Sequence, residues 1–448
     1  MEPTVENLCG YLTRSHLLND DEVESLHQRW RSEGAQPSTS ASQFTRWLVR
    51  EKYLTEYQAG LLIKGQINDF FLDEFKILER VGRGRMAGVY KAVTKTGAIV
   101  AIKVLPPSRA KVLPLLARFQ REAQLSLRLQ HVNIVQGLNV GETKGLHYLV
   151  MEFLEGETLD EVLQRRKTLP PLEAARLIHQ TLLGLQHMHE SGMVHRDIKP
   201  ANLMLVPGGR NAEPDTTTQS TVKILDIGLA RPLLEEALKG DSSELTQEGV
   251  LLGTPDYLSP EQARDPRTID IRSDLYSLGC VFHQLLVGQP PFPDLNLLNQ
   301  MVRHATEPPR PVRSFDPTIP EAIEQIIIYM LAKNADHRFP TPARAAETIA
   351  PLLGMVAESK ATKSTAGKAG AKRGSAPIPV SRPHAPPDEN PFDASPVDVE
   401  LIAISSAPIV AAAKPVEPAR HGWILAAIVA GALGLTGAIV VVMRMILR

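Results

Sequence analysis

The sequence predicts an α+β protein, preceded by a small N-terminal helical module and followed by a C-terminal transmembrane helix. Three observations support this prediction. Residues 75–105 show the β-branched enrichment and tight turns of an antiparallel sheet. Residues 172–188 carry apolar side chains at helical spacing. Residues 423–443 form a long apolar run without a charge, which is typical of a membrane span.

The composition limits the classes of function. A chain of 448 residues is too long for one ordinary core, so several units are expected. The formal net charge of -1 gives no global basic field, and we expect no nucleic-acid partner. Cys9 and Cys280 are far apart, which argues against a disulfide framework or a cysteine metal site. Glu2 and Glu6 interrupt any signal-peptide pattern.

Residues 1–70 are predicted to form the helical module, because their apolar side chains recur at roughly helical spacing. Asn19 is placed to cap a helix over residues 22–30, and residues 54–59 open a later helix. The surface of the module could bind a partner or the lobe that follows. The alternative is a packing extension without a ligand.

A carboxylate, an amine and an amide lie within the short segment 195–202. Asp197 can accept a hydroxyl proton, Lys199 can neutralise a transferred phosphate, and Asn202 can hold a metal ion. The spacing H-R-D-x-x-x-x-N is the catalytic-loop pattern of protein kinases. The chain therefore resembles the eukaryotic-type (Hanks-type) Ser/Thr protein kinases of bacteria over about residues 75 to 350.

The resemblance implies the two-lobed protein-kinase fold for residues 75–353, with ATP in the cleft between the lobes. Backbone N–H groups of a glycine-rich segment would then approach the phosphates. The third glycine of the family's G-x-G-x-x-G pattern is replaced here, with a glycine one place later. The segment comprises Val81, Gly82, Arg83, Gly84, Arg85, Met86, Ala87, Gly88 and Val89.

Further positions match the family's nucleotide site. Lys103 stands in the sequence V-A-I-K and would reach the α- and β-phosphates, positioned by Glu122 of the next helix. Asp226 matches the aspartate of D-F-G and would bind Mg²⁺ together with Asn202, with Ile227 in place of phenylalanine. The resemblance also implies adenine contacts from Ala101, from the backbone of Glu152 and Leu154, and from Met204.

The segment after this site resembles the substrate side of the family. Residues 253–261 match the substrate-docking loop and its A-P-E end, with Ser259 in place of alanine. Glu261 is expected to pair with Arg338, and Asp274 to tie the backbone of the catalytic loop. Residues 231–253 match the activation segment, with candidate phosphorylation sites at Ser242, Ser243 and Thr246. The alternative is a solvated polar loop.

The C-terminal part is predicted to be a disordered Ala/Pro/Lys-rich linker over residues 355–420, followed by a membrane span over residues 423–443. Positive charges over residues 360–382 could lie near anionic lipids, or the segment is a solvated tether. The expected topology is a single pass near the C-terminus with the kinase domain in the cytoplasm. Small residues every fourth position could support a homodimer, although generic small-residue content explains them equally well.

We therefore expect a Ser/Thr protein kinase that transfers the ATP γ-phosphoryl group to protein substrates, including itself, in bacterial signalling. Its cofactors would be ATP and Mg²⁺. One rival is a membrane-tethered scaffold without activity, suggested by Ala87, Ile227 and Ser259. Another is a small-molecule kinase, which the docking segment 253–261 argues against.

Overall fold

The computed structural model describes residues 3–33, 40–83, 87–208, 217–226, 255–264 and 269–364. Several positions singled out in the sequence lie outside these residues: Gly84, Arg85, Met86, Ile227, the phosphorylation candidates 242–246, and the apolar run 423–443. Within the described ranges, no helix has the length and apolar character that crossing a membrane requires.

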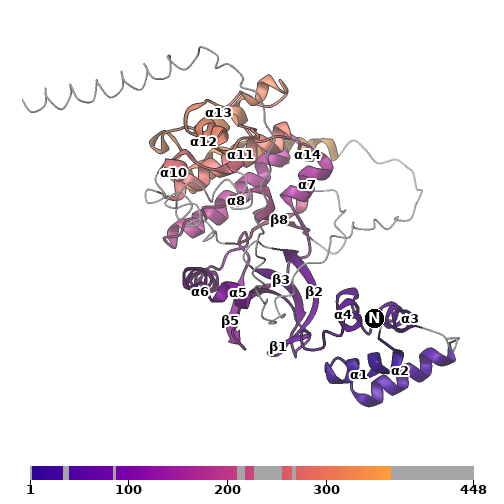
Figure 1. The fold of residues 1–448 in the computed structure, drawn as a ribbon. Coiled ribbons are helices and arrows are strands. Elements are labelled where there is room, and N and C mark those ends of the chain that lie inside the picture. The colour runs from indigo at the N-terminus through magenta and orange to yellow at the C-terminus, as the bar shows by residue number, and fades with distance from the viewer. Residues whose placement is uncertain are drawn as a thin grey trace, which may run out of the picture. The chain divides into compact units, whose positions relative to one another are not determined.

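Four helices form the N-terminal module (Figure 1). Their apolar faces meet in a common core in which Leu8, Phe44 and Leu62 are fully buried. Asn19 caps the second helix as predicted, since its Oδ1 accepts from Glu22 N at 2.8 Å and Glu22 Oε2 accepts from Asn19 N at 2.8 Å. The helices are α1 (Val5–Arg14), α2 (Asp20–Ser32), α3 (Ala41–Arg50) and α4 (Glu56–Ile63).

An antiparallel sheet follows, with strand order β1-β2-β3-β4-β6-β5. One of its faces buries Ile77, Tyr90 and Ile102. The other face packs Leu149 and Met151 against Phe119 of a helix. The strands are β1 (Phe71–Leu72), β2 (Phe75–Arg83), β3 (Gly88–Val93), β4 (Ile99–Leu105), β5 (Gly137–Thr143) and β6 (Leu146–Glu152), and the helices between them are α5 (Pro107–Ala110) and α6 (Leu113–Arg128).

The rest of the described chain forms a helical lobe with a small sheet of order β7-β8-β9. Helix α11 is buried along nearly its whole length, because α8, α13 and α14 all contact it. Gly279 permits this packing, since a Cβ there would lie 2.8 Å from Met330 Cβ of α13. The elements are β7 (Glu157–Thr158), α7 (Leu159–Arg166), α8 (Pro171–Glu190), β8 (Leu203–Val206), β9 (Thr221–Ile224), α10 (Pro260–Arg264), α11 (Ile271–Val287), α12 (Leu297–Thr306), α13 (Glu321–Met330) and α14 (Pro342–Ser364).

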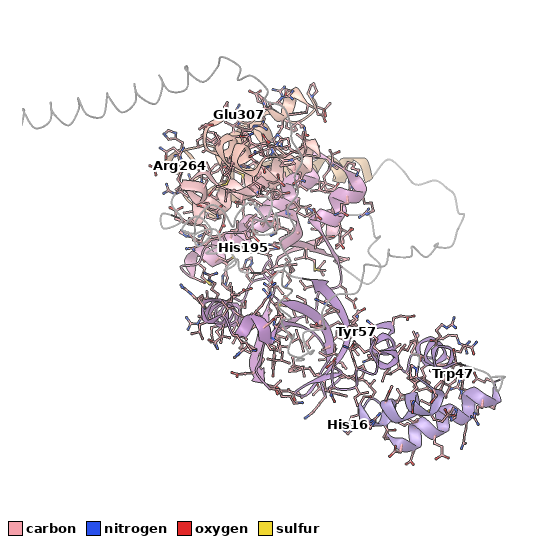
Figure 2. The ribbon with its side chains drawn as sticks, viewed as in Figure 1. His16, Trp47, Tyr57, His195, Arg264 and Glu307 are labelled. Atoms are coloured by element: carbon pink, nitrogen blue, oxygen red, sulfur yellow. The ribbon has the colours of Figure 1, made fainter. Side chains whose placement is uncertain are left out.

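Short 3₁₀ turns connect these elements: Pro200–Asn202, Thr217–Gln219, Pro255–Tyr257, Val312–Ser314 and Ala335–His337. Helix α14 continues beyond residue 355, where the sequence predicts linker. Figure 2 shows His195, the first residue of the catalytic loop, at the junction of the six-stranded sheet and the helical lobe.

Candidate active site

The catalytic-loop residues that the sequence predicted lie in hydrogen-bonding contact. Asp197 Oδ2 accepts from Lys199 Nζ at 2.7 Å and from Asn202 Nδ2 at 3.0 Å. Asn202 Nδ2 also donates to the backbone carbonyl of Asp197 at 2.8 Å. The carboxylate therefore has a set direction, and its Oδ1, which receives no hydrogen bond from the residues that the structure describes, can accept from an incoming hydroxyl.

A fully buried carboxylate accepts hydrogen bonds from the backbone of this loop. Asp274 of α11 accepts from His195 N and Arg196 N, both at 2.7 Å, as expected from the sequence. Arg196 has a φ of 68°, a left-handed conformation that costs energy for a residue with a side chain. The two charge-assisted bonds offset this cost, and the strained peptide is kept in place.

Lys103 and Glu122 also meet as predicted. Lys103 Nζ of β4 lies 2.6 Å from Glu122 Oε1 of α6 and 2.9 Å from Asp226 Oδ1. Burial opposes the positive charge of Lys103, but the carboxylates of Asp226 and Glu122 raise its pKa. Lys103 in turn lowers the pKa of Asp226. Both groups are consequently charged at neutral pH, and Lys103 can attract a polyanion.

A cleft with a volume of about 560 Å³ opens beside this ion-pair cluster. Asp226 lines it, so the cleft and the cluster form one site. Eight residues that the sequence assigned to nucleotide or metal binding line it: Val81, Gly82, Val89, Ala101, Glu152, Leu154, Met204 and Asp226. Its lining combines apolar side chains such as Val81, Ala101 and Met204 with charged ones that include Lys91 and Asp226, and this mixture suits a planar ring attached to phosphates.

The sequence interpretation missed several residues of the cleft. Leu225 directly precedes Asp226, and this adjacency is the signal that could have identified it. Phe153 stands between Glu152 and Leu154 in the predicted adenine-binding segment, so it could have been found there. Val135 and Thr158 also line the cleft but stand outside any motif. Val135 is held there by its backbone bond to Ile224 of β9, and Thr158 belongs to β7.

A second ion pair anchors the strand that carries the predicted adenine contacts. Lys223 Nζ of β9 lies 2.6 Å from Glu152 Oε1 at the end of β6. The same oxygen accepts from Gln136 N at 2.8 Å. Because β9 runs directly into Asp226, this ion pair links the part of the cleft that carries the predicted adenine contacts to the part that Asp226 lines. No motif indicated a role for Lys223.

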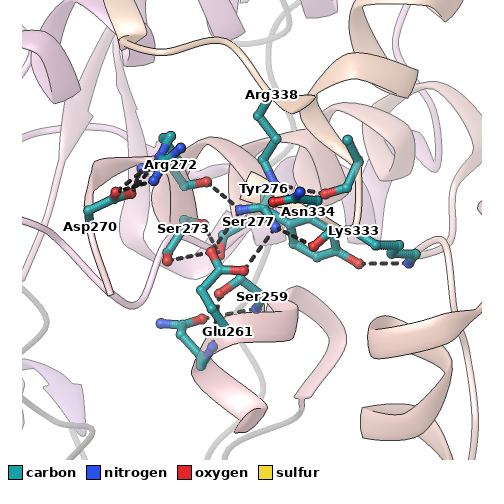
Figure 3. A network of polar contacts seen from close by, with 12 residues as sticks. Ser259, Glu261, Asp270, Arg272, Ser273, Tyr276, Ser277, Lys333, Asn334 and Arg338 are labelled. Atoms are coloured by element: carbon teal, nitrogen blue, oxygen red, sulfur yellow. Dashed lines mark hydrogen bonds and ion pairs between the residues drawn. The ribbon is translucent and has the colours of Figure 1, made fainter. Parts of the chain in front are cut away.

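The predicted pair of Glu261 and Arg338 is present (Figure 3). The two guanidinium nitrogens of Arg338 lie 2.7 and 2.8 Å from the two carboxylate oxygens of Glu261. Ser273 Oγ donates to Glu261 Oε1 at 2.6 Å. Burial opposes ionisation of Glu261, yet Arg338 lowers its pKa. The pair fixes α10 at the start of α11, where it supports the catalytic loop.

Comparison with known proteins assigns this part of the chain to a family. The family described as protein kinase domain matches residues 75–348. The chain belongs to the protein kinase domain family.

Bacterial proteins are among the curated relatives of this kinase domain. The chain is 38% identical over 265 residues to a probable serine/threonine-protein kinase, SCO3848, of Streptomyces coelicolor, covering 58% of this chain and 37% of that protein. It is 34% identical over 276 residues to the serine/threonine-protein kinase PknB of Mycobacterium leprae, covering 60% of this chain and 42% of that protein. The chain thus spans about two fifths of the length of these relatives.

Among solved structures, the kinase domain of PknI from Mycobacterium tuberculosis aligns with a TM-score of 0.48 and 22% identity, covering 63% of this chain and 98% of that one. Helices α1 to α4 lie before the first residue matched by the kinase family.

Proposed function

We propose that this protein is a serine/threonine protein kinase, which transfers the γ-phosphoryl group of ATP to hydroxyl groups of protein substrates and of itself. The observation that carries the proposal is the geometry of Asp197, whose carboxylate is oriented by Lys199 at 2.7 Å and by Asn202 at 3.0 Å. A carboxylate held in this way can orient an acceptor hydroxyl and take its proton.

The neighbouring lysine side chains stabilise the negative charge of the phosphate groups. Lys199, beside the acceptor position, stabilises the negative charge that develops on the transferred group. Lys103 is held by Glu122 at 2.6 Å and neutralises the phosphates that remain on the nucleotide. Little covalent chemistry is required of the protein, so positioning and electrostatics account for the rate.

The donor set fits Mg²⁺, which would be held by Asn202 and Asp226. Asn202 O accepts from Leu225 N at 2.9 Å, and this bond keeps Asp226 beside Asn202. Magnesium takes one or two side-chain oxygens and completes its coordination with phosphates and water. No cluster of three or more His, Cys, Asp or Glu side chains that could hold a metal ion occurs among the residues described. When bound, Mg²⁺ would neutralise the phosphate oxygens.

We further propose that the chain is anchored by a single membrane span over residues 423–443, with the kinase domain on the cytoplasmic side. The support is the uncharged apolar composition of this run, which is long enough to cross about 30 Å of hydrocarbon. Fractionation of cells that express the full chain and a chain ending at residue 420 tests this proposal. Recovery of the full chain in the soluble fraction would contradict it.

The decisive experiment on activity is phosphate incorporation by the full-length chain and by Asp197→Asn. With ATP and Mg²⁺, we expect phosphoserine or phosphothreonine on the chain and on a generic protein substrate, mapped by mass spectrometry. Asp197→Asn should lose transfer while it binds ATP as before. Transfer at the original rate in Asp197→Asn would contradict the proposed role. Binding without any transfer by the wild-type chain would favour a scaffold.

A further inference from the structure

The outer edge of β2 is only partly covered by another strand. Along one side β2 pairs with β3, and along the other the short strand β1 reaches only as far as Lys76. The register shifts between Ile77 and Glu79, so Leu78 lies in a bulge. Carbonyl groups at such an edge require partners from outside the sheet.

Helix α4 of the N-terminal module supplies these partners. Gln58 Nε2 donates to the carbonyl of Ile77 at 2.7 Å, and Thr55 Oγ1 donates to the carbonyl of Leu78. Gln58 is only 1% exposed, so its bond to the strand is shielded from water. Both bonds are made by side chains of the first turn of α4.

The same two side chains also cap α4 itself. Gln58 N donates to Thr55 Oγ1 at 3.2 Å, and Thr55 N donates to Gln58 Oε1 at 3.1 Å. Each side chain thus uses its acceptor for the helix and its donor for the strand. This division makes it possible to remove the bond to β2 while the cap is kept.

The contact continues into the hairpin that covers the predicted phosphate site. Tyr57 of α4 packs against the fully buried Tyr90 of β3, with ring centroids 6.3 Å apart, and Figure 2 shows Tyr57 beside the sheet. The ring of Tyr90 lies close to Gly88, where a Cβ would be 2.9 Å from Tyr90 Cε2. Gly82 pairs with Val89, and both line the cleft. Helix α4 therefore contacts both strands just before they reach the nucleotide.

We propose that Thr55 and Gln58 are positioning residues for nucleotide binding, and that the N-terminal module sets the affinity for ATP through the β2–β3 hairpin. When α4 already holds the outer edge of the hairpin, the hairpin loses less conformational entropy as the phosphates bind. The free-energy cost of binding ATP is then smaller. The inference rests on the proposed function for the identity of the ligand. It assigns to the module a role that the kinase family, which begins at residue 75, does not include.

The test uses the full-length chain with Thr55→Asp, with Gln58→Glu, and with both. Aspartate and glutamate keep the capping acceptors of α4 but lack the donors to β2. We expect the dissociation constant of a non-hydrolysable ATP analogue with Mg²⁺, measured by calorimetry, to rise about five- to tenfold per lost bond. The KM for ATP should rise in parallel, with kcat at saturating ATP unchanged. Thr55→Ser keeps the hydroxyl donor, so this variant should bind the analogue with wild-type affinity.

Two controls separate positioning from folding. Thr4→Ala removes the side-chain cap of α1 but leaves the bonds of Thr55 and Gln58 to β2 in place, so it should leave the affinity unchanged. Gln58→Met removes the donor without burying a charge, so it serves if Gln58→Glu does not fold. Wild-type affinity in the folded double variant or in Gln58→Met would overturn the inference, even where the melting temperature falls. Absence of nucleotide binding by the wild-type chain would instead overturn the proposed function.

Discussion

Lys103 Nζ of β4 lies 2.6 Å from Glu122 Oε1 of α6, and only 12% and 14% of the two side chains are exposed. The pair can form only when α6 packs closely against the sheet, as the contact of Phe119 and Ala123 with Leu149 and Met151 ensures. Lys103 also reaches Asp226 at 2.9 Å. The two contacts of Lys103 therefore form only when the sheet, α6 and Asp226 are assembled together.

Removing the amine of Lys103 should abolish most of the phosphoryl transfer. Lys103→Met leaves the carboxylates of Glu122 and Asp226 without their cation and removes a positive charge from the phosphates. We expect kcat to fall roughly 10²–10³-fold, the usual cost of losing one electrostatic contact in a transition state. Phosphate incorporation measures the effect, and Lys91→Met, at a lysine that lines the same cleft on β3, is the matched control. Equal losses in the two variants would contradict a specific role for Lys103.

The ion pair between Lys223 and Glu152 should affect nucleotide affinity more than the chemical step. Lys223→Met or Glu152→Gln frees the end of β6, so we expect the KM for ATP to rise several-fold while kcat changes little. A double-mutant cycle with both substitutions gives the coupling energy, expected at about 1 kcal/mol for a partly buried pair. If the effects of the two single substitutions on the KM for ATP simply added in the double variant, the pair would not act as a unit.

The pair between Glu261 and Arg338 should contribute to stability. Arg338 has a fully buried side chain, so Glu261→Gln leaves a buried guanidinium without its counter-charge. We expect the free energy of unfolding to fall by about 3–5 kcal/mol. The exposed pair Arg344–Glu347 is the control, and Glu347→Gln should change stability by about 0–1 kcal/mol. Denaturant unfolding measures the stability of both variants. If Glu261→Gln lost as little stability as Glu347→Gln, the stabilising role of the pair between Glu261 and Arg338 would be contradicted.

His283 should make the fold less stable at mildly acidic pH. Burial in α11 lowers the pKa of His283 to about 4, whereas an unfolded histidine titrates near 6.5. Between these values the unfolded chain binds a proton that the folded chain does not, so stability is present above pH 6.5 and is lost as the pH falls. At pH 5 the loss attributable to this group is about 2 kcal/mol.

Unfolding free energies at pH 7 and pH 5 test this expectation. The difference between the two pH values should be smaller in His283→Gln than in the wild-type chain, because glutamine does not titrate. An unchanged difference would assign the acid sensitivity to other groups.

The sequence by itself determined the family and the polar residues of the site. Asp197, Lys199 and Asn202 belong to one short loop, so their spacing alone brings them together, and the structure confirms their contacts. Lys103 and Glu122 were identified by their motifs and meet as expected. These residues could be recognised because their charges serve the same chemistry wherever the motif occurs.

Only the tertiary structure decided which groups support that site. A lysine on a strand, such as Lys223, is ordinarily solvated, and nothing local points it toward Glu152. The sequence indicated a helix at residues 54–59, but it did not indicate that Gln58 would bond to the carbonyl of Ile77. Periodicity records which face of an element is apolar, whereas the partner of a polar side chain depends on the packing of distant segments. Hydrogen bonds between such segments exist only once the fold has excluded water from between them.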